Sequence, residues 1–111
     1  MRHAVPWGRV AVAGRSMEPT LRDGDWLVVR WSAAAVRPGR LVVVRLPGGP
    51  LSVKRALRRT PEGWWVERDN PREGVDSWQV GAVPPEGVLG VVVLRYRPLS
   101  RLRYWPPCSR S

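Results

Sequence analysis

Short apolar runs, each bounded by glycine, proline or aspartate, are the feature that most constrains how this chain folds. The runs are rich in valine, and their length suits β-strands better than the helices of a globular core. Such a pattern predicts a mainly β domain built from antiparallel strands. Six strands are expected, at residues 10–13, 26–31, 41–46, 51–57, 63–68 and 88–97.

The connections between these runs carry further information. The PGGP segment at 47–50 predicts a hairpin between the third and fourth strands, and TPEG at 60–63 joins the fourth strand to the fifth. Helical signals are confined to residues 17–21, where Pro19 suits a first turn, and to residues 32–36. Residues 98–111 mix arginine, aromatic residues and proline without a period, so we expect a basic tail after a domain at residues 1–97.

Size and composition narrow the class of protein. The 111 residues fit a single domain with a modest core. No apolar stretch approaches the ~20 residues of a membrane helix, and the N-terminus lacks the apolar core of a signal peptide, so we expect a soluble, cytoplasmic protein without a membrane span. The single cysteine, Cys108, rules out an internal disulfide and makes a zinc cluster implausible. We expect no cofactor and no metal.

The charge of the chain is unusual in its make-up. The formal net charge is +10, which would attract nucleic acid, anionic lipid or an acidic protein without choosing among them. Of the 19 Lys and Arg residues, 18 are arginines and one is a lysine, Lys54. A general preference for arginine explains the 18 arginines, but it does not explain why position 54 is a lysine.

The segment GRSMEPTLRDGDWLVV contains a candidate nucleophile, Ser16. A serine hydroxyl needs a base to take its proton, and the usual base is histidine. The one histidine, His3, lies beside the N-terminus, so a Ser-His-Asp triad is not expected, and neither His3 nor Cys108 is assigned a chemical role. Arginine keeps its proton, whereas burial can lower the pKa of a lysine by several units. Lys54 is therefore the candidate base.

Three blocks of sequence, in order, resemble the Ser-Lys peptidases related to bacterial type I signal peptidases. GRSMEPTLRDGDWLVV resembles the nucleophile block and VKRALRR the block of the general base. ERDNPREGVDSWQVGAVPPEGVLG resembles the Asp-Asn, Asp-Ser, Gly-x-Val-Pro signature, matching at Asp69, Asn70, Asp76, Ser77, Gly81, Val83 and Pro84. The resemblance spans about residues 10–93 and implies a signal peptidase/LexA-like peptidase fold of coiled antiparallel sheets.

The resemblance also implies roles for single residues. Ser16 is the expected nucleophile, its backbone N–H the oxyanion donor, and Lys54 the general base. The substrate, a protein or peptide, is expected to add as an extended strand beside residues 12–15 and 52–54. Its expected contacts are Gly14, Arg15, Met17, Ser52 and Val53. Structural support behind the pair is expected from Arg55, Asp69, Asn70 and Asp76, with Arg55 and Asp69 as an ion pair.

The chain departs from the family pattern at three positions. Gly14 stands where a serine often donates to the oxyanion, which leaves the Ser16 N–H as the main donor. Gly74 stands where a second serine usually orients the lysine, so that support must come from elsewhere. Trp78 replaces an arginine that normally pairs with an aspartate, which puts an ion pair at Asp76 in doubt.

Within this superfamily the third block favours the signal-peptidase side, because the self-cleaving repressors of the DNA-damage response lack it. The separation of 38 residues in sequence between Ser16 and Lys54 is nevertheless close to the separation of nucleophile and base in the repressors. Among relatives without a membrane anchor, the chain is similar to the short maturation proteases of nickel-type superoxide dismutase. That likeness implies removal of an N-terminal propeptide.

Simpler interpretations remain for each signal. Ser16 alone could cap a turn, and Lys54 alone could be a solvated strand residue. A basic β module that grips nucleic acid through arginine and tryptophan would explain the charge, but it gives no reason for SMEPT or for the single lysine. We therefore expect peptidase activity and no nucleic-acid partner, with the tryptophans packed in the core and cleft wall.

Overall fold

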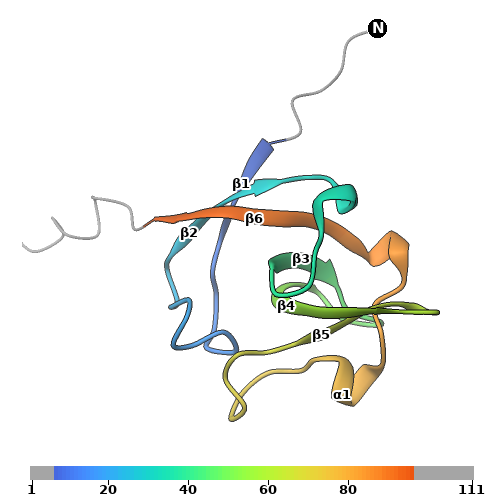
Figure 1. The fold of residues 1–111 in the computed structure, drawn as a ribbon. Coiled ribbons are helices and arrows are strands. Elements are labelled where there is room, and N and C mark those ends of the chain that lie inside the picture. Colours follow the sequence, from blue (N-terminus) through green and yellow to red (C-terminus); the bar gives the residue numbers. More distant parts are fainter. Residues whose placement is uncertain (1–6, 97–111) are drawn as a thin grey trace, which may run out of the picture.

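A computed structural model describes residues 7–96, and its strands confirm the mainly β fold. His3, Cys108 and the expected tail at 98–111 lie outside the described residues. Six strands and three short helical segments follow one another along the chain (Figure 1). They are β1 (Trp7–Ala11), β2 (Trp26–Arg30), the 3₁₀ helix η1 (Ala33–Ala35), β3 (Leu41–Arg45), β4 (Leu51–Thr60), β5 (Gly63–Glu67), α1 (Ser77–Val80), the 3₁₀ helix η2 (Pro85–Gly87) and β6 (Val88–Tyr96).

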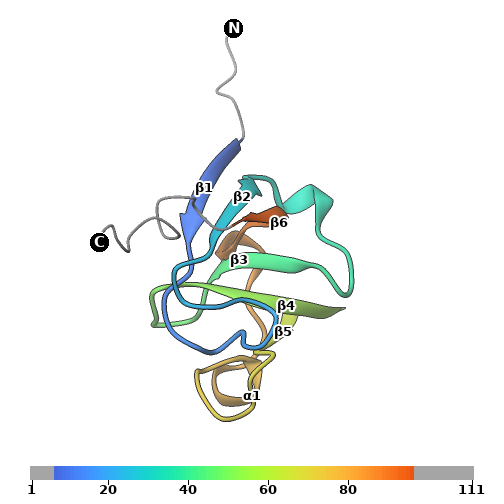
Figure 2. The ribbon, with the colours of Figure 1, turned by 90° about the vertical axis from the view of Figure 1, so that its left-hand side faces the viewer.

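The strands form one antiparallel sheet in the order β1-β2-β6-β3-β4-β5. The last strand, β6, lies in the middle, where it joins the β1–β2 hairpin to the β3–β4–β5 meander. Register shifts at Val28/Val29 and Val43/Val44 interrupt the ladders on both sides of β6. Such irregularities increase local twist, and the two halves of the sheet are turned relative to each other (Figures 1 and 2).

Two hydrophobic clusters fill the interior. The larger cluster packs β3, β4 and β5 against the segment that ends in η2, and Val42, Ala56 and Val83 are among its fully buried members. The smaller cluster brings Met17 and Leu21 from the loop after β1 onto the sheet. This loop carries Ser16, so its packing fixes the candidate nucleophile to the core.

The helical segments differ from the sequence expectation. Residues 17–21 form a turn closed by one bond from the Leu21 N–H to the Met17 carbonyl (2.9 Å), not a helix. The segment at 32–36 is the short 3₁₀ helix η1, capped by the Ser32 side chain. Helix α1 was not predicted, although Asp76 and Gln79 form a capping box whose spacing is readable in the sequence.

The tryptophans do not pack as the composition suggested. Trp64 alone among the described tryptophans is buried, whereas Trp7, Trp31 and Trp78 are exposed. Two of the six lie on the outward face of β1 and β2, where guanidinium groups cover their rings: Arg9 covers Trp26 and Arg30 covers Trp7. Alternation along these two strands places both rings away from the core. Within residues 7–96, no helix has the length and apolar character needed to cross a membrane.

Glycine is required where β5 begins. Gly63 has φ +146°, and a Cβ atom there would overlap the carbonyl oxygen of Val83. That carbonyl accepts a bond from the Trp64 N–H at 2.9 Å, so neither backbone can move away freely.

We therefore expect Gly63→Ala to lower the free energy of unfolding by more than about 1 kcal/mol. Gly49→Ala is the matched control, because its Cβ would meet the nearest atoms of Leu46 at an ordinary 3.6 Å. Denaturant unfolding of both variants and the wild type measures the difference. Equal stability of the two variants would contradict this account of Gly63.

Candidate functional site

The loop that carries Ser16 is held at both ends by backbone hydrogen bonds. Val12 continues the β1–β2 pairing through bonds with Asp25 and Gly24, each 2.8 Å. Gly14, at φ +87°, then turns the chain, and its N–H donates to the Asp23 carboxylate at 2.9 Å. Beyond the turn, the Ser16 carbonyl accepts from the Asn70 N–H at 2.8 Å. Ser16 is thereby fixed between the β1–β2 hairpin and the loop after β5.

Lys54 reaches Ser16 from the opposite wall. It lies on β4 opposite Val42 of β3, and only 3% of its surface is exposed. Its Nζ lies 3.0 Å from the Ser16 Oγ, within hydrogen-bonding distance. A protonated amine donates in this contact, whereas a neutral amine accepts the hydroxyl proton. The structure therefore brings together the candidate nucleophile and the one lysine of the chain.

The surroundings of Lys54 act on its charge in opposite directions. Burial lowers the pKa of Lys54, the carboxylate of Asp76 raises it, and the guanidinium of Arg68 lowers it again. The net result is a pKa below the ordinary value of a lysine. A larger fraction of the amine is therefore neutral at a given pH than for a lysine in water.

The loop at residues 70–76 closes the site from the side of β5. Gly74, at φ +100°, packs against Ser16 so closely that a Cβ atom there would lie 2.5 Å from the Ser16 Cβ. A serine at this position could not orient Lys54 without moving the loop. The glycine is therefore a consequence of how tightly this loop approaches Ser16.

Asp69 is bound on two sides, as part of a cluster behind Ser16. Arg55 donates to both of its oxygens, at 3.2 and 2.5 Å, and Thr20 donates from its hydroxyl at 2.6 Å. The Asp69 N–H also lies 3.3 Å from the Met17 sulfur. The predicted Arg55–Asp69 pair is present, whereas Thr20 was missed. Its signal was its place four residues after Ser16 in the nucleophile block.

Asp76 and Asn70 fix the same loop through the backbone. Asp76 is buried, caps α1 through the Trp78 N–H at 3.0 Å and accepts from the Arg68 N–H at 2.9 Å. Its carboxylate also pairs with the Arg68 guanidinium at 3.5 Å. Asp76 thus has an ion pair despite Trp78, and sequence reasoning did not find its partner. Asn70 donates from its side chain to the Arg15 carbonyl at 2.8 Å.

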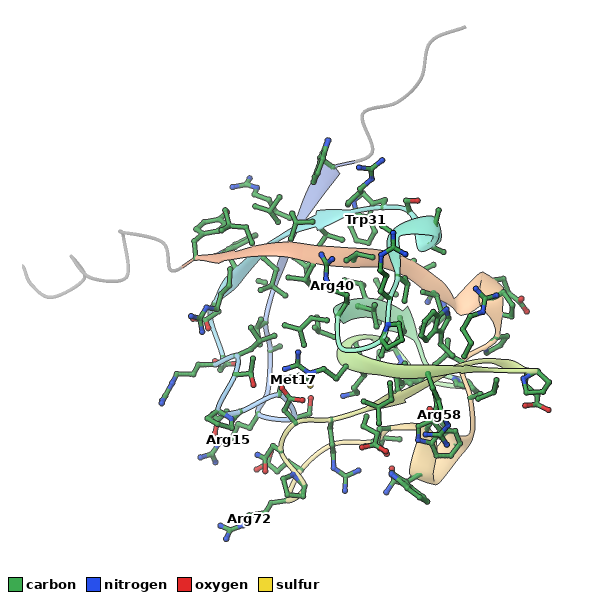
Figure 3. The ribbon with its side chains drawn as sticks, in the orientation of Figure 1. Arg15, Met17, Trp31, Arg40, Arg58 and Arg72 are labelled. Atoms are coloured by element: carbon green, nitrogen blue, oxygen red, sulfur yellow. The ribbon has the colours of Figure 1, made fainter. Side chains whose placement is uncertain are left out.

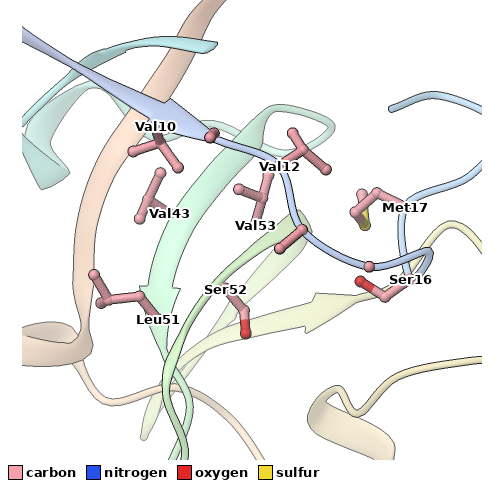
Figure 4. Close-up of a pocket in the computed structure, with 11 residues that line it drawn as sticks. Val10, Val12, Ser16, Met17, Val43, Leu51, Ser52 and Val53 are labelled. Atoms are coloured by element: carbon pink, nitrogen blue, oxygen red, sulfur yellow. The ribbon is translucent and has the colours of Figure 1, made fainter. Parts of the chain in front are cut away.

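An apolar cavity of about 140 Å³ opens beside Ser16 (Figure 4). Four of the five predicted substrate contacts line it, namely Gly14, Met17, Ser52 and Val53. Val10, Val12, Val43 and Leu51 complete most of its wall. A second hollow crosses Ser16 and Lys54 and is bordered by Gly74 and Val75.

Arg15, the fifth predicted contact, does not line the apolar cavity. It borders the second hollow and is paired with Glu18 and Glu73 at 3.5 and 3.8 Å. Figure 3 shows Arg15 and Arg72 at the same edge of the molecule, with Met17 lying further in. No group of three or more potential metal ligands occurs in the part of the chain that the structure describes.

The chain matches the family model described as Peptidase S24-like over residues 5–92, which is well over half of its length. It therefore belongs to this family of Ser-Lys peptidases, of the LexA and signal peptidase type. The expectation of a Ser-Lys peptidase fold is confirmed. A search of curated proteins gave no match.

The Asp69 cluster makes folding sensitive to acid. Burial raises the pKa of Asp69, but the hydrogen bonds from Arg55 and Thr20 and the charge of Arg55 outweigh it, so the net pKa is lowered. A lowered carboxyl pKa adds stability that is fully present above about pH 4 and is lost as the pH falls through the folded-state value.

We expect Asp69→Asn to lower the free energy of unfolding by about 1–3 kcal/mol at pH 7, because charge-assisted hydrogen bonds are lost. The difference from wild type should shrink as the pH falls below about 4. Glu62→Gln is the control, since Glu62 is exposed in the turn before β5. Unfolding curves from pH 2 to 7 measure this, and a gap that stays constant with pH would contradict the assignment.

Proposed function

We propose that this protein is a serine endopeptidase in which Ser16 is the nucleophile and Lys54 the general base. The observation that carries the proposal is the 3.0 Å contact between Oγ and Nζ across 38 residues of sequence. Burial of Lys54 supports it, because a base must lose its proton near neutral pH. Membership of a Ser-Lys peptidase family supports the same reaction.

In the proposed mechanism, neutral Lys54 accepts the hydroxyl proton of Ser16 while Oγ attacks the scissile carbonyl. The protonated amine then donates that proton to the departing amine, which leaves an acyl-enzyme and a neutral lysine. Lys54 next takes a proton from water, and the hydroxide attacks the acyl carbon. The bond between that carbon and the Ser16 Oγ then breaks, and Lys54 returns the proton to Oγ. The Ser16 backbone N–H is the proposed oxyanion donor, because the Gly14 N–H is already bonded to Asp23.

The substrate is proposed to bind as an added strand between the two walls of the site. Strand β5 pairs with β4 only from Arg55 onward, so residues 51–54 have no ladder partner on that side within the described chain. Residues 12–14 face residues 51–53 across the cavity, so an extended peptide placed there would pass Ser16. The apolar cavity suits a small aliphatic side chain next to the cut.

We propose that the biological role of this peptidase is to remove an N-terminal propeptide or leader from another protein. The similarity of the three sequence blocks to signal-peptidase relatives supports this, and the likeness to the short maturation proteases makes a nickel superoxide dismutase precursor the first substrate to try. A second candidate is self-cleavage of the repressor type, which the 38-residue spacing and the family match favour.

One experiment separates these candidates. The purified protein is incubated with a propeptide-bearing nickel superoxide dismutase, and the N-termini of both proteins are read by mass spectrometry. A new N-terminus on the dismutase supports propeptide removal, and a new terminus on the protein itself supports self-cleavage. Cleavage that persists with Ser16→Ala protein would come from a contaminant and would count against the proposal.

We expect Ser16→Ala and Lys54→Ala each to lower kcat/KM by several orders of magnitude while the fold is kept, because both act in one proton-transfer unit. Ser32→Ala is the matched serine control: it removes a cap on η1 and leaves the site untouched. Peptide-cleavage rates and circular dichroism measure the two effects. Activity retained in either site variant would exclude the Ser-Lys pair.

Lysine and arginine at position 54 should behave differently. Lys54→Arg keeps the charge, so a nucleic-acid-binding role would survive it, but arginine cannot give up its proton and cleavage should be lost. The wild-type kcat/KM should rise with pH as Lys54 becomes neutral and then level off, at a lower pH than an ordinary lysine would give because its pKa is lowered. Cleavage by Lys54→Arg, or a flat wild-type profile, would point to another base.

A further inference from the structure

The buried carboxylate of Asp76 presents a problem for a lysine base. Asp76 is 2% exposed, and its negative charge favours the protonated form of Lys54. In the relatives that the sequence resembles, an arginine at the position of Trp78 pairs with an aspartate. Here the Trp78 side chain is 70% exposed, and its indole N–H donates to Glu67 at 2.8 Å. The Trp78 side chain therefore supplies no positive charge to balance Asp76, and Trp78 meets that carboxylate only through its backbone N–H, at 3.0 Å.

Arg68 comes from a different place in the chain and meets the same carboxylate. Its Nη1 lies 3.5 Å from the Asp76 Oδ2, and its backbone N–H donates to that oxygen at 2.9 Å. The Arg68 side chain is 17% exposed, so water screens this pair only in part. The negative charge of Asp76 is thus partly neutralised by the guanidinium of Arg68, the residue that directly follows β5.

The same guanidinium ties the loop together. Nε and Nη2 donate to the carbonyls of Asn70 and Pro71, and Nη1 donates to the Gln79 side chain, each at 3.1 Å. The Arg68 Cδ lies within 3.5 Å of the place where a Cβ atom of Gly74 would be. Its stem therefore backs the glycine that packs against Ser16.

We propose that Arg68 is a positioning residue that replaces the arginine missing at position 78: it neutralises Asp76 and holds the 70–76 loop against Ser16, so that Lys54 can act as a base. This inference rests on the proposed function of the Ser16–Lys54 pair. Nothing in the three sequence blocks assigns Arg68 a role. Its place directly before Asp69 in the third block is the signal that sequence reasoning passed over.

Few other charges act on Lys54. Arg15 and Glu73 border the same hollow, but they are paired with each other and largely exposed. Arg55 follows Lys54 directly on β4, but its guanidinium is hydrogen-bonded to the carboxylate of Asp69. Asp76 and Arg68 are the charges whose fields change the pKa of Lys54. Removing the charge of Asp76 should therefore lower the pKa of Lys54, and removing the charge of Arg68 should raise it.

The single lysine makes a direct test possible. In protein labelled with 13C at the ε-carbon of lysine, the side-chain signal comes from Lys54 alone, and its chemical shift follows protonation. We expect Arg68→Gln to move the titration midpoint to higher pH and Asp76→Asn to move it to lower pH. The double variant should return toward the wild-type midpoint, because both charges are gone.

Two further variants separate charge from structure. Arg68→Lys keeps the charge and loses the forked contacts. It adds a second labelled lysine, whose signal a variant that combines Lys54→Ala with Arg68→Lys identifies, and we expect Lys54 to keep a near wild-type midpoint with a lower kcat. Arg72→Gln removes an exposed arginine from the same loop and should leave the midpoint unchanged. Thermal unfolding of every variant shows whether it is folded, and the Asp76→Asn and Arg68→Lys results stand even when Arg68→Gln does not fold.

Cleavage rates measured against pH should follow the same shifts, and below the midpoint each pH unit of alkaline shift corresponds to about a tenfold loss in kcat/KM. Midpoints of Lys54 that do not move in Arg68→Gln or Asp76→Asn would overturn the inference, whatever happens to the rate. The titration needs no substrate, so absence of cleavage by the wild type would count against the proposed function alone.

Discussion

The contact between a buried lysine amine and a serine hydroxyl is the constraint on which the rest of this structure depends. An ammonium group loses hydration when strand β4 carries it into the interior, and the 3.0 Å contact with Ser16 is one of the few polar contacts available to it. The cost of that burial favours the neutral amine. A fold that places Lys54 here therefore spends stability on a group whose usefulness lies in losing its charge.

Two ion pairs, Arg55–Asp69 and Arg68–Asp76, hold Ser16 and Lys54 in place from two sides. Arg55, Asp69 and Thr20 form a cluster beneath the turn that carries Ser16, and the Asp69 N–H also contacts the Met17 sulfur. Arg68 and Asp76 hold the loop that approaches Ser16 from the side of β5. Each wall of the site thus has its own ion pair, and neither pair involves Ser16 or Lys54 directly.

Much of this was readable in the sequence, and the exceptions have physical causes. Valine-rich runs ended by turn residues predicted five of the six strands closely, because alternation and turn chemistry are local properties. The first strand was expected at 10–13 and lies earlier, at Trp7–Ala11, because it begins with residues outside the apolar run. The strand order was not predicted, since the central place of β6 depends on long-range pairing. At the site, the Arg55–Asp69 pair was predicted from block order. Arg68 and Thr20 stand inside the sequence blocks, but their contacts, like the fit of Gly74 against Ser16, depend on how separate loops meet.

The use of arginine elsewhere in the chain explains why position 54 is different. Arginine forms both ion pairs behind the site and covers tryptophan rings on β1, β2 and β5, tasks that benefit from a planar, forked group that never loses its proton. The proposed role of Lys54 requires the opposite property. Lysine gives up its proton when it is desolvated, and a guanidinium in the same place would hold Ser16 by a hydrogen bond without activating it. The one lysine among 19 Lys and Arg residues thus stands at the single position where a permanent charge would prevent the proposed reaction.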